Sequence, residues 1–226
     1  MKNLSTKTVL FASLIIGVLF LAGIVLAAGN QKDSGPAPTL PILLEEFSDF
    51  QCPACGAYFG LIEEVLDEYG SDIEFVYKHF PLRTIHPNAF AAAIASEAAR
   101  EQGKFMEYAE ELFANQRNLG DETYVAIAAK LELDIDKFES DRKSPDIIAR
   151  VNADIADGNS RGVNATPTFY IEGKKVNFGT SDPALKLREL LDEQIRKAKE
   201  AVSYTDSITP TEVDQLGEEE SVEDNQ

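Results

Sequence analysis

The sequence is poor in cysteine, histidine and basic residues, and each shortage excludes a class of protein. Only two of the 226 residues are cysteine and two are histidine, while 21 Lys and Arg stand against 39 Asp and Glu, for a net charge of −18. Two cysteines do not make a disulfide-stabilised scaffold. Without a basic stripe to displace counterions from phosphates, nucleic acid is not an expected partner. A zinc site is disfavoured as well, because the spacing from Cys55 to His79 does not match the usual finger patterns.

The two cysteines that are present stand three residues apart and are the most informative feature of the chain. Residues 47–55 read Phe-Ser-Asp-Phe-Gln-Cys-Pro-Ala-Cys, between an apolar run typical of a strand and the start of a helical pattern. A bridge that closes so small a loop constrains the unfolded chain little, which favours a redox role over a stabilising one. The free N–H groups and partial positive charge of a helix N-terminus favour a thiolate at Cys52. We therefore expect Cys52 to be the nucleophile and Cys55 to resolve the mixed disulfide.

The N-terminal part of the chain predicts export. Residues 9–28 contain no charged residue, and twenty helical residues at ~1.5 Å each span ~30 Å, the thickness of a bilayer hydrocarbon core. Lys2 and Lys7 precede this segment and predict that residues 1–8 lie in the cytoplasm. An uncleaved single-pass anchor is favoured over a cleaved signal peptide, whose apolar region runs ~7–15 residues. Both interpretations place the following domain on the extracytoplasmic side of the cell membrane, after a Pro-rich linker over residues 29–41.

The pattern that follows predicts one α/β domain over residues 42–203, in the order β α β, a helical insertion, then β β α. The insertion covers about residues 87–161, with Asp121 and Ser144 as expected helix N-caps. The other elements are expected at 42–48, 53–69, 73–77, 168–172, 175–178 and 183 to about 202. Residues 204–226 contain eight acidic residues and no Lys or Arg, so an acidic disordered tail is expected.

Two further positions attract attention on chemical grounds. One of the adjacent residues Glu45 and Glu46 must point inward if both faces of the first strand are covered. A buried carboxylate near Cys52 can accept or pass a proton, so Glu46 is a candidate; alternatively both lie at a frayed strand edge. The Thr166–Pro167 bond immediately precedes a strand and is expected to be trans on general frequency. His79 and His86 are expected to be ordinary loop or surface histidines.

Four segments together resemble the DsbA-like thiol:disulfide oxidoreductases, and most closely their membrane-anchored, BdbD-type branch. They are the cysteine segment at residues 47–55, Tyr-Lys-His-Phe-Pro-Leu at 77–82, His-Pro at 86–87 and Gly-Val-Asn-Ala-Thr-Pro-Thr-Phe at 162–169. The resemblance covers about residues 40–200 and implies a thioredoxin fold with an inserted helical domain.

The resemblance also implies roles for individual residues. It implies that Pro167 is cis and faces the cysteine pair, and that Thr166 shapes the substrate groove through its backbone. Pro53 and Ala54 are assigned to the same substrate surface. It implies that Glu46 is the buried acid beneath the nucleophile. No metal and no bound cofactor are expected, since the Cys52–Cys55 disulfide is itself the redox group.

The resemblance implies partners too. Members of the family pass their disulfide to cysteines of exported polypeptides, and a quinone-linked integral membrane protein, DsbB- or VKOR-like, reoxidises them. Ala54 stands where the best-known members carry histidine, which predicts a less strongly oxidising pair. Despite this departure from the family pattern, oxidation of exported proteins is the preferred function. Two alternatives remain: a disulfide reductase or isomerase, and a tethered peptide-binding module without turnover.

Overall fold

The computed structural model describes residues 39–207. The predicted cytoplasmic segment 1–8, the anchor or signal segment 9–28, and most of the linker 29–41 and of the acidic tail 204–226 lie outside the described residues. Within residues 39–207 no helix combines the length and apolar character that a membrane span requires.

A four-stranded sheet forms the centre of the domain, with the strand order β2-β1-β3-β4. β1 pairs in parallel with β2 and antiparallel with β3, so that Glu46 lies between Tyr77 and Phe169. Because β1 has a neighbour on each side, its end, where the cysteine segment begins, is firmly placed. The strands are β1 (Ile42–Ser48), β2 (Ile73–His79), β3 (Thr168–Ile171) and β4 (Lys174–Lys175).

The strand predicted at residues 175–178 is wrong in extent, since β4 contains only Lys174 and Lys175. The reason is packing of the residues that follow. Phe178 packs edge-on against Phe169 at 5.8 Å between ring centroids and also contacts Tyr58 at 5.9 Å. Because this aromatic ring is partly buried against the core, the chain leaves the sheet after Lys175 and β4 stays short.

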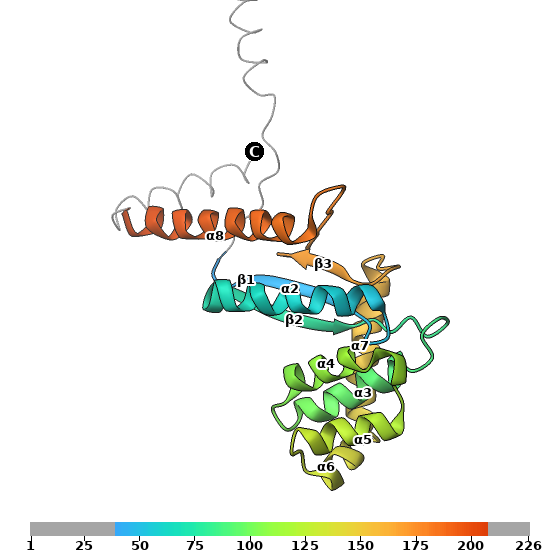
Figure 1. The fold of residues 1–226 in the computed structure, drawn as a ribbon. Coiled ribbons are helices and arrows are strands. Elements are labelled where there is room, and N and C mark those ends of the chain that lie inside the picture. The colour runs from blue at the N-terminus through green and yellow to red at the C-terminus, as the bar shows by residue number, and fades with distance from the viewer. Residues whose placement is uncertain (1–38, 208–226) are drawn as a thin grey trace, which may run out of the picture. The chain divides into compact units, whose positions relative to one another are not determined.

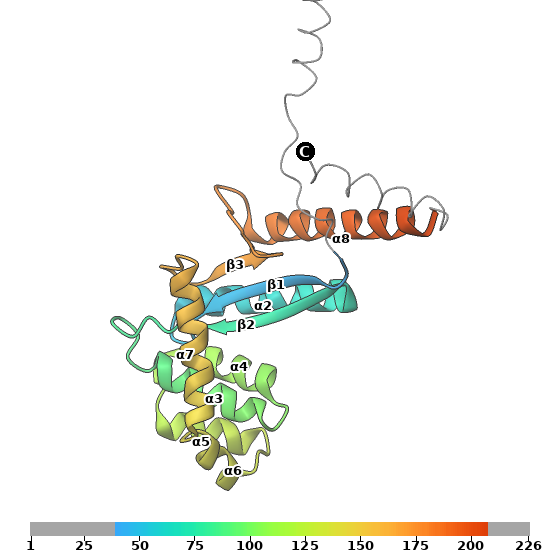
Figure 2. The same ribbon diagram turned by 180° about the vertical axis from the view of Figure 1, so that it is seen from behind.

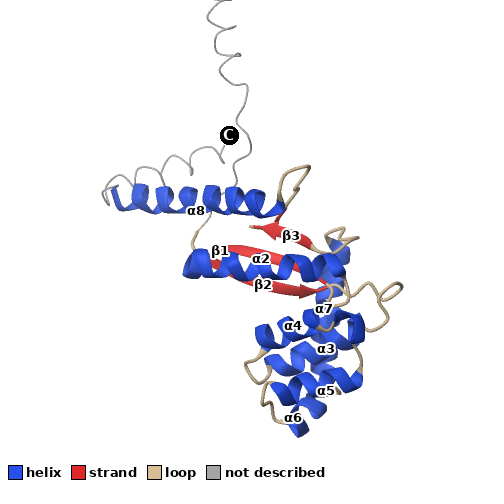
Figure 3. Cartoon of the chain, in the orientation of Figure 1, coloured by secondary structure: helices blue, strands red, loops and turns tan. Residues whose placement is uncertain are grey.

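Helices α2 (Pro53–Tyr69) and α8 (Pro183–Ser207) supply the apolar cover of one face of the sheet (Figures 1 and 3). The alternate residues Ile42 and Leu44 of β1 point to this face, where they form a core with side chains of both helices. The helical partners in this core are Ile62, Val65, Leu187, Leu191, Ile195 and Ala198. α8 runs beyond its predicted end near residue 202.

The helical insertion gathers beyond the β2 edge of the sheet, and α7 leads back to β3 (Figure 2). The alanine-rich α3 buries Ala92, Ala95 and Ala99 in a second core, as small side chains allow close helix packing. Ser144 caps α7 as predicted, whereas Gly120 stands at the cap of α5 and Asp121 is already in its first turn. The insertion comprises α3 (Ala89–Arg100), α4 (Phe105–Ala114), η2 (Gln116–Asn118), α5 (Asp121–Lys130), α6 (Ile135–Asp141) and α7 (Pro145–Ser160). The predicted α/β fold with an inserted helical domain is confirmed.

Candidate redox site

The two cysteines occupy different environments at the start of α2. Cys52 is the N-cap residue, with extended backbone angles (φ −78°, ψ 120°), and Pro53 takes the first helical position. Proline fits there because its missing N–H has no partner in the first turn. Both thiols are free, and Cys52 keeps 8% of its surface exposed while Cys55 is fully buried. An incoming thiol therefore has access to Cys52 alone.

The electrostatics of the site separate the two thiols. A hydrogen bond from Cys55 lowers the pKa of Cys52 to about 5, against the effect of burial. The Thr166 side chain and the backbone N–H groups of Cys55 and Ala54 lower it further. Burial raises the pKa of Cys55 well above its usual range. At neutral pH the reduced site therefore holds a Cys52 thiolate beside a protonated Cys55 thiol.

The Thr166–Pro167 peptide lies against this pair. Its bond is cis, as the resemblance implies and general frequency does not. Cys52 Sγ lies 3.4 Å from the Thr166 carbonyl oxygen, to which it donates a hydrogen bond only when it is protonated. Pro53 and Ala54 are exposed beside the sulfur. The structure thus places the Thr166 carbonyl, Pro53 and Ala54 next to the reacting sulfur.

Glu46 lies buried on the same face of β1 as the core under α2. Burial raises its pKa to about 7, opposed by the Ser48 hydroxyl nearby and reinforced by the charge of Cys52. Its Oε2 atom has no hydrogen-bond partner. The Ser48 hydroxyl acts to lower the pKa of Cys55 as well, but its oxygen too is buried without a hydrogen-bond partner. A carboxyl that titrates near neutrality is able to give or take a proton there.

Asp49 organises the loop beside the nucleophile, a role that the sequence did not reveal. Its fully buried carboxylate accepts from the backbone N–H of Gln51 at 2.7 Å and of Leu82 at 2.8 Å, and contacts His86 Nδ1 at 2.8 Å. Gln51 Oε1 in turn accepts from the backbone N–H of Asn88 at 2.9 Å. Hydrogen bonds to Asp49 and Gln51 therefore hold the loop between β2 and α3 against the turn that leads to the nucleophile.

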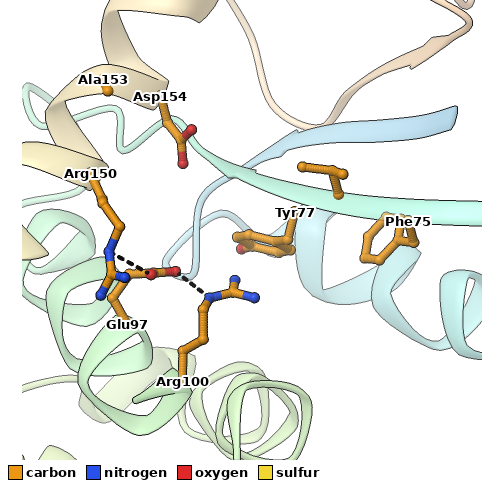
Figure 4. A pocket seen from close by; sticks show the side chains of 8 residues that line it. Phe75, Tyr77, Glu97, Arg100, Arg150, Ala153 and Asp154 are labelled. Atoms are coloured by element: carbon orange, nitrogen blue, oxygen red, sulfur yellow. Dashed lines mark hydrogen bonds and ion pairs between the residues drawn. The ribbon is translucent and has the colours of Figure 1, made fainter. Parts of the chain in front are cut away.

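His79 is not the loop or surface histidine that was expected. Its ring is buried, with Nε2 2.9 Å from Glu97 Oε1. Burial opposes ionisation of Glu97, yet His79 and Arg100 lower the pKa of this carboxyl to about 2. Figure 4 shows Arg100 and Arg150 on either side of Glu97 in a pocket of about 370 Å³. Since this pocket is lined by β2, α3 and α7 and by neither cysteine, we interpret the cluster as a structural ion network.

Within residues 39–207, no three His, Cys, Asp or Glu side chains are grouped so that they could hold a metal ion.

Comparisons with known proteins define the class. A family model described as thioredoxin matches residues 38–193. Among solved structures, DsbA2 of Pseudomonas aeruginosa is 25% identical, with a TM-score of 0.56 over 69% of this chain and 89% of that chain. BdbD of Bacillus subtilis, in its oxidised form, is 19% identical, with a TM-score of 0.60 over 73% and 90%. The chain shares the fold of these DsbA-like proteins, and it carries a buried pair of cysteines at the start of α2.

The chain belongs to the thioredoxin family, and its resemblance to DsbA-like oxidoreductases is confirmed. Among curated relatives, the Na(+)/H(+) antiporter NhaA 1 of Mycobacterium sp. strain KMS is 40% identical over 155 residues, which is 68% of this chain. The matched part is only 25% of that antiporter, so the chain spans about a quarter of the length of the curated relatives it matches.

Proposed function

We propose that the protein is an exported disulfide oxidase, which passes the Cys52–Cys55 disulfide to cysteines of exported polypeptides. The observation that carries the proposal is the asymmetry of the pair. Cys52 is acidic and reachable, while Cys55 is buried and holds its proton. An acidic thiol is a good leaving group, which favours transfer of the disulfide to the substrate over its retention.

The first step opens the enzyme disulfide. A substrate thiolate attacks Cys52 Sγ, the bond between Cys52 and Cys55 breaks, and its electron pair leaves on the Cys55 sulfur. Because the pKa of Cys55 is raised, this sulfur takes up a proton. Glu46, with its pKa raised by burial to about 7, is the buried acid that we assign to supply this proton.

The second step releases the product. A second substrate thiolate attacks the substrate sulfur of the mixed disulfide, and Cys52 leaves as a thiolate stabilised by the start of α2. The substrate dithiol has lost two electrons and the enzyme disulfide has gained them. The mixed disulfide lies along the Thr166–Pro167 peptide, beside the exposed residues Pro53 and Ala54. The disulfide is the redox group, and no further cofactor takes part.

The proposal also includes the location of the protein in the cell and the partner that reoxidises it. Residues 9–28 anchor the chain in the cell membrane, with the catalytic domain on the extracytoplasmic side, or are removed as a signal after export. A quinone-linked integral membrane protein of the DsbB or VKOR type takes the two electrons from the reduced pair and restores the disulfide.

Trapping in cells tests the function. The full-length Cys55→Ala variant should accumulate mixed disulfides on Cys52, with exported proteins and with the reoxidising partner. The matched Cys52→Ser variant should accumulate none. Equal capture by both variants would contradict an oxidase. So would a reduction potential of the wild-type cysteine pair, measured by equilibration with glutathione, that is more reducing than that of its compartment. A Cys52→Ser strain without phenotype would favour a peptide-binding module.

A further inference from the structure

One side chain of the helical insertion, Gln116, donates a hydrogen bond to the backbone of the reacting cysteine. This residue begins η2, one residue after the C-cap Asn115 of α4, and is 64 residues from Cys52 in sequence. Its Nε2 group donates to the Phe50 carbonyl at 2.9 Å and to the Cys52 carbonyl at 2.8 Å. A primary amide has two N–H bonds, so both are used on the turn that carries the nucleophile.

These two hydrogen bonds restrain the backbone on both sides of Cys52. The Phe50 carbonyl belongs to a peptide unit before Cys52, and the Cys52 carbonyl belongs to the unit after it. The Cys52 carbonyl also begins the helical hydrogen bonding of α2, since the Gly56 N–H donates to it at a rather long 3.2 Å. Holding both carbonyls fixes the direction of Sγ relative to the free N–H groups of the first turn.

The amide also occupies a space that the helix leaves for it. A Cβ atom placed on Gly56 would lie 2.8 Å from Gln116 Oε1 and 3.1 Å from its Cδ. Any side chain larger than hydrogen at this position of α2 displaces the amide. Next to it, the Phe113 ring of α4 packs on Phe50 at 5.0 Å and on Phe59 at 4.9 Å between centroids. The amide is therefore seated by contacts from both the helix and the insertion.

We infer that Gln116 is a positioning residue for the disulfide exchange proposed above, through which the helical insertion sets the reactivity of Cys52. The inference rests on the proposed function and adds a contribution from outside the sheet and α2. Its two donated hydrogen bonds draw the negative ends of two carbonyl dipoles toward the amide and keep the N–H groups of Ala54 and Cys55 directed at the sulfur. Loss of these bonds destabilises the thiolate relative to the thiol.

The Gln116→Glu variant of the full-length protein in mild detergent is the direct test. It keeps the shape of the side chain, removes both donors and brings a negative charge to the turn. We expect the pKa of Cys52, followed by thiolate absorbance, to rise by about one unit, and the equilibrium with glutathione to shift about tenfold toward the disulfide form. Gln102→Glu is the matched control: Gln102 is half-buried in the same insertion and bridges the backbone of Asp134, with bonds of 3.1 and 2.8 Å.

Two further variants separate positioning from folding. Gly56→Ala displaces the amide from the opposite side and should raise the pKa of Cys52 in the same direction, although alanine favours the helix. Gln116→Leu, for use if Gln116→Glu does not fold, removes the donors without adding charge, and should give a shift of about threefold in the glutathione equilibrium.

Unchanged Cys52 acidity and glutathione equilibrium in the folded Gln116 variants would overturn the inference, even if their stability fell as far as that of Gln102→Glu. Failure of the proposed function looks different, since the wild-type protein itself would then lack an acidic Cys52 or fail to exchange disulfides.

Discussion

Glu45 and Glu46 are neighbours on β1, yet they lie on opposite faces of the sheet and meet opposite electrostatic conditions. Glu45 accepts two hydrogen bonds from the Arg161 guanidinium, at 2.9 and 2.8 Å. Glu46 has an Oε2 atom without any hydrogen-bond partner. One carboxylate is thus neutralised by a cation, and the other is left to titrate beside the cysteines.

The unpaired carboxyl should make the protein less stable as the pH rises. The pKa of Glu46 is raised from 4.5 to about 7, so the unfolded state releases this proton first and the folded state is penalised between these values. Glu46→Gln removes the penalty. The stability of the reduced variant relative to wild type should therefore grow by about 3 kcal/mol between pH 4.5 and pH 7 and then level off. Urea unfolding across this range measures it, and parallel curves would contradict it.

Glu45, which is paired with Arg161, leads to the opposite expectation: a substitution that removes its partner should destabilise the protein. Arg161→Met keeps an apolar stem over the Tyr170 ring, 3.7 Å from the guanidinium carbon, but leaves Glu45 largely buried without its cation. We expect a loss of about 2 kcal/mol in the free energy of unfolding at pH 7. Lys143→Met is the control. Lys143 is 76% exposed and pairs with Glu139 at the longer distance of 3.6 Å, and exposed ion pairs of this kind contribute little to stability. Equal effects of the two substitutions would remove the special role of the Glu45–Arg161 pair.

The reduced and oxidised forms should differ in stability in a pH-dependent way. The pKa of Cys52 is lowered from 9.0 to about 5 in the folded reduced protein. A depressed pKa gives stability that is complete above pH 9 and is lost as the pH falls toward 5. The disulfide form lacks this titration. We therefore expect the melting temperature of the dithiol form, relative to the disulfide form, to rise from pH 5 to pH 8; a constant difference would show that the Cys52 thiolate is not stabilised by the fold.

Gly158 of α7 provides a test of the packing between the insertion and the sheet. A Cβ atom there would lie 2.6 Å from the Phe80 ring and 3.1 Å from Phe47, both in the core on the far face of β1. Gly158→Ala should cost about 1–3 kcal/mol through overpacking, despite the better helix propensity of alanine. Gly60→Ala in α2 meets no atom within 4 Å and should stabilise by up to about 1 kcal/mol. Thermal unfolding of the two variants in opposite directions is the expected result.

The parts of the fold that sequence predicts well are those determined locally. β1 begins at Ile42 and ends at Ser48, and α2 begins at Pro53, as the apolar run and the proline indicate. The separation of reactivity between Cys52 and Cys55 follows from the same local geometry. The extent of β4 could not be predicted, because it depends on where the Phe178 ring finds space in the core.

The supporting residues of the site were hidden for a different reason. Gln116 reaches the turn across 64 residues, and the carboxylate of Asp49 meets His86 across 37. A glutamine after a helix and an aspartate in a turn are common in any sequence, and only the tertiary fold brings them to the dithiol. The cis bond before Pro167 is also not predicted by local sequence preference; only the family resemblance indicated it.

The near-complete covering of the reactive sulfur limits the moment at which the protein can act. With 8% of Cys52 exposed and Cys55 fully buried beneath it, a thiol on an extended segment has easier access to the sulfur than a thiol held on a folded surface. For the oxidase proposed above, this favours client segments that have not yet packed into a core.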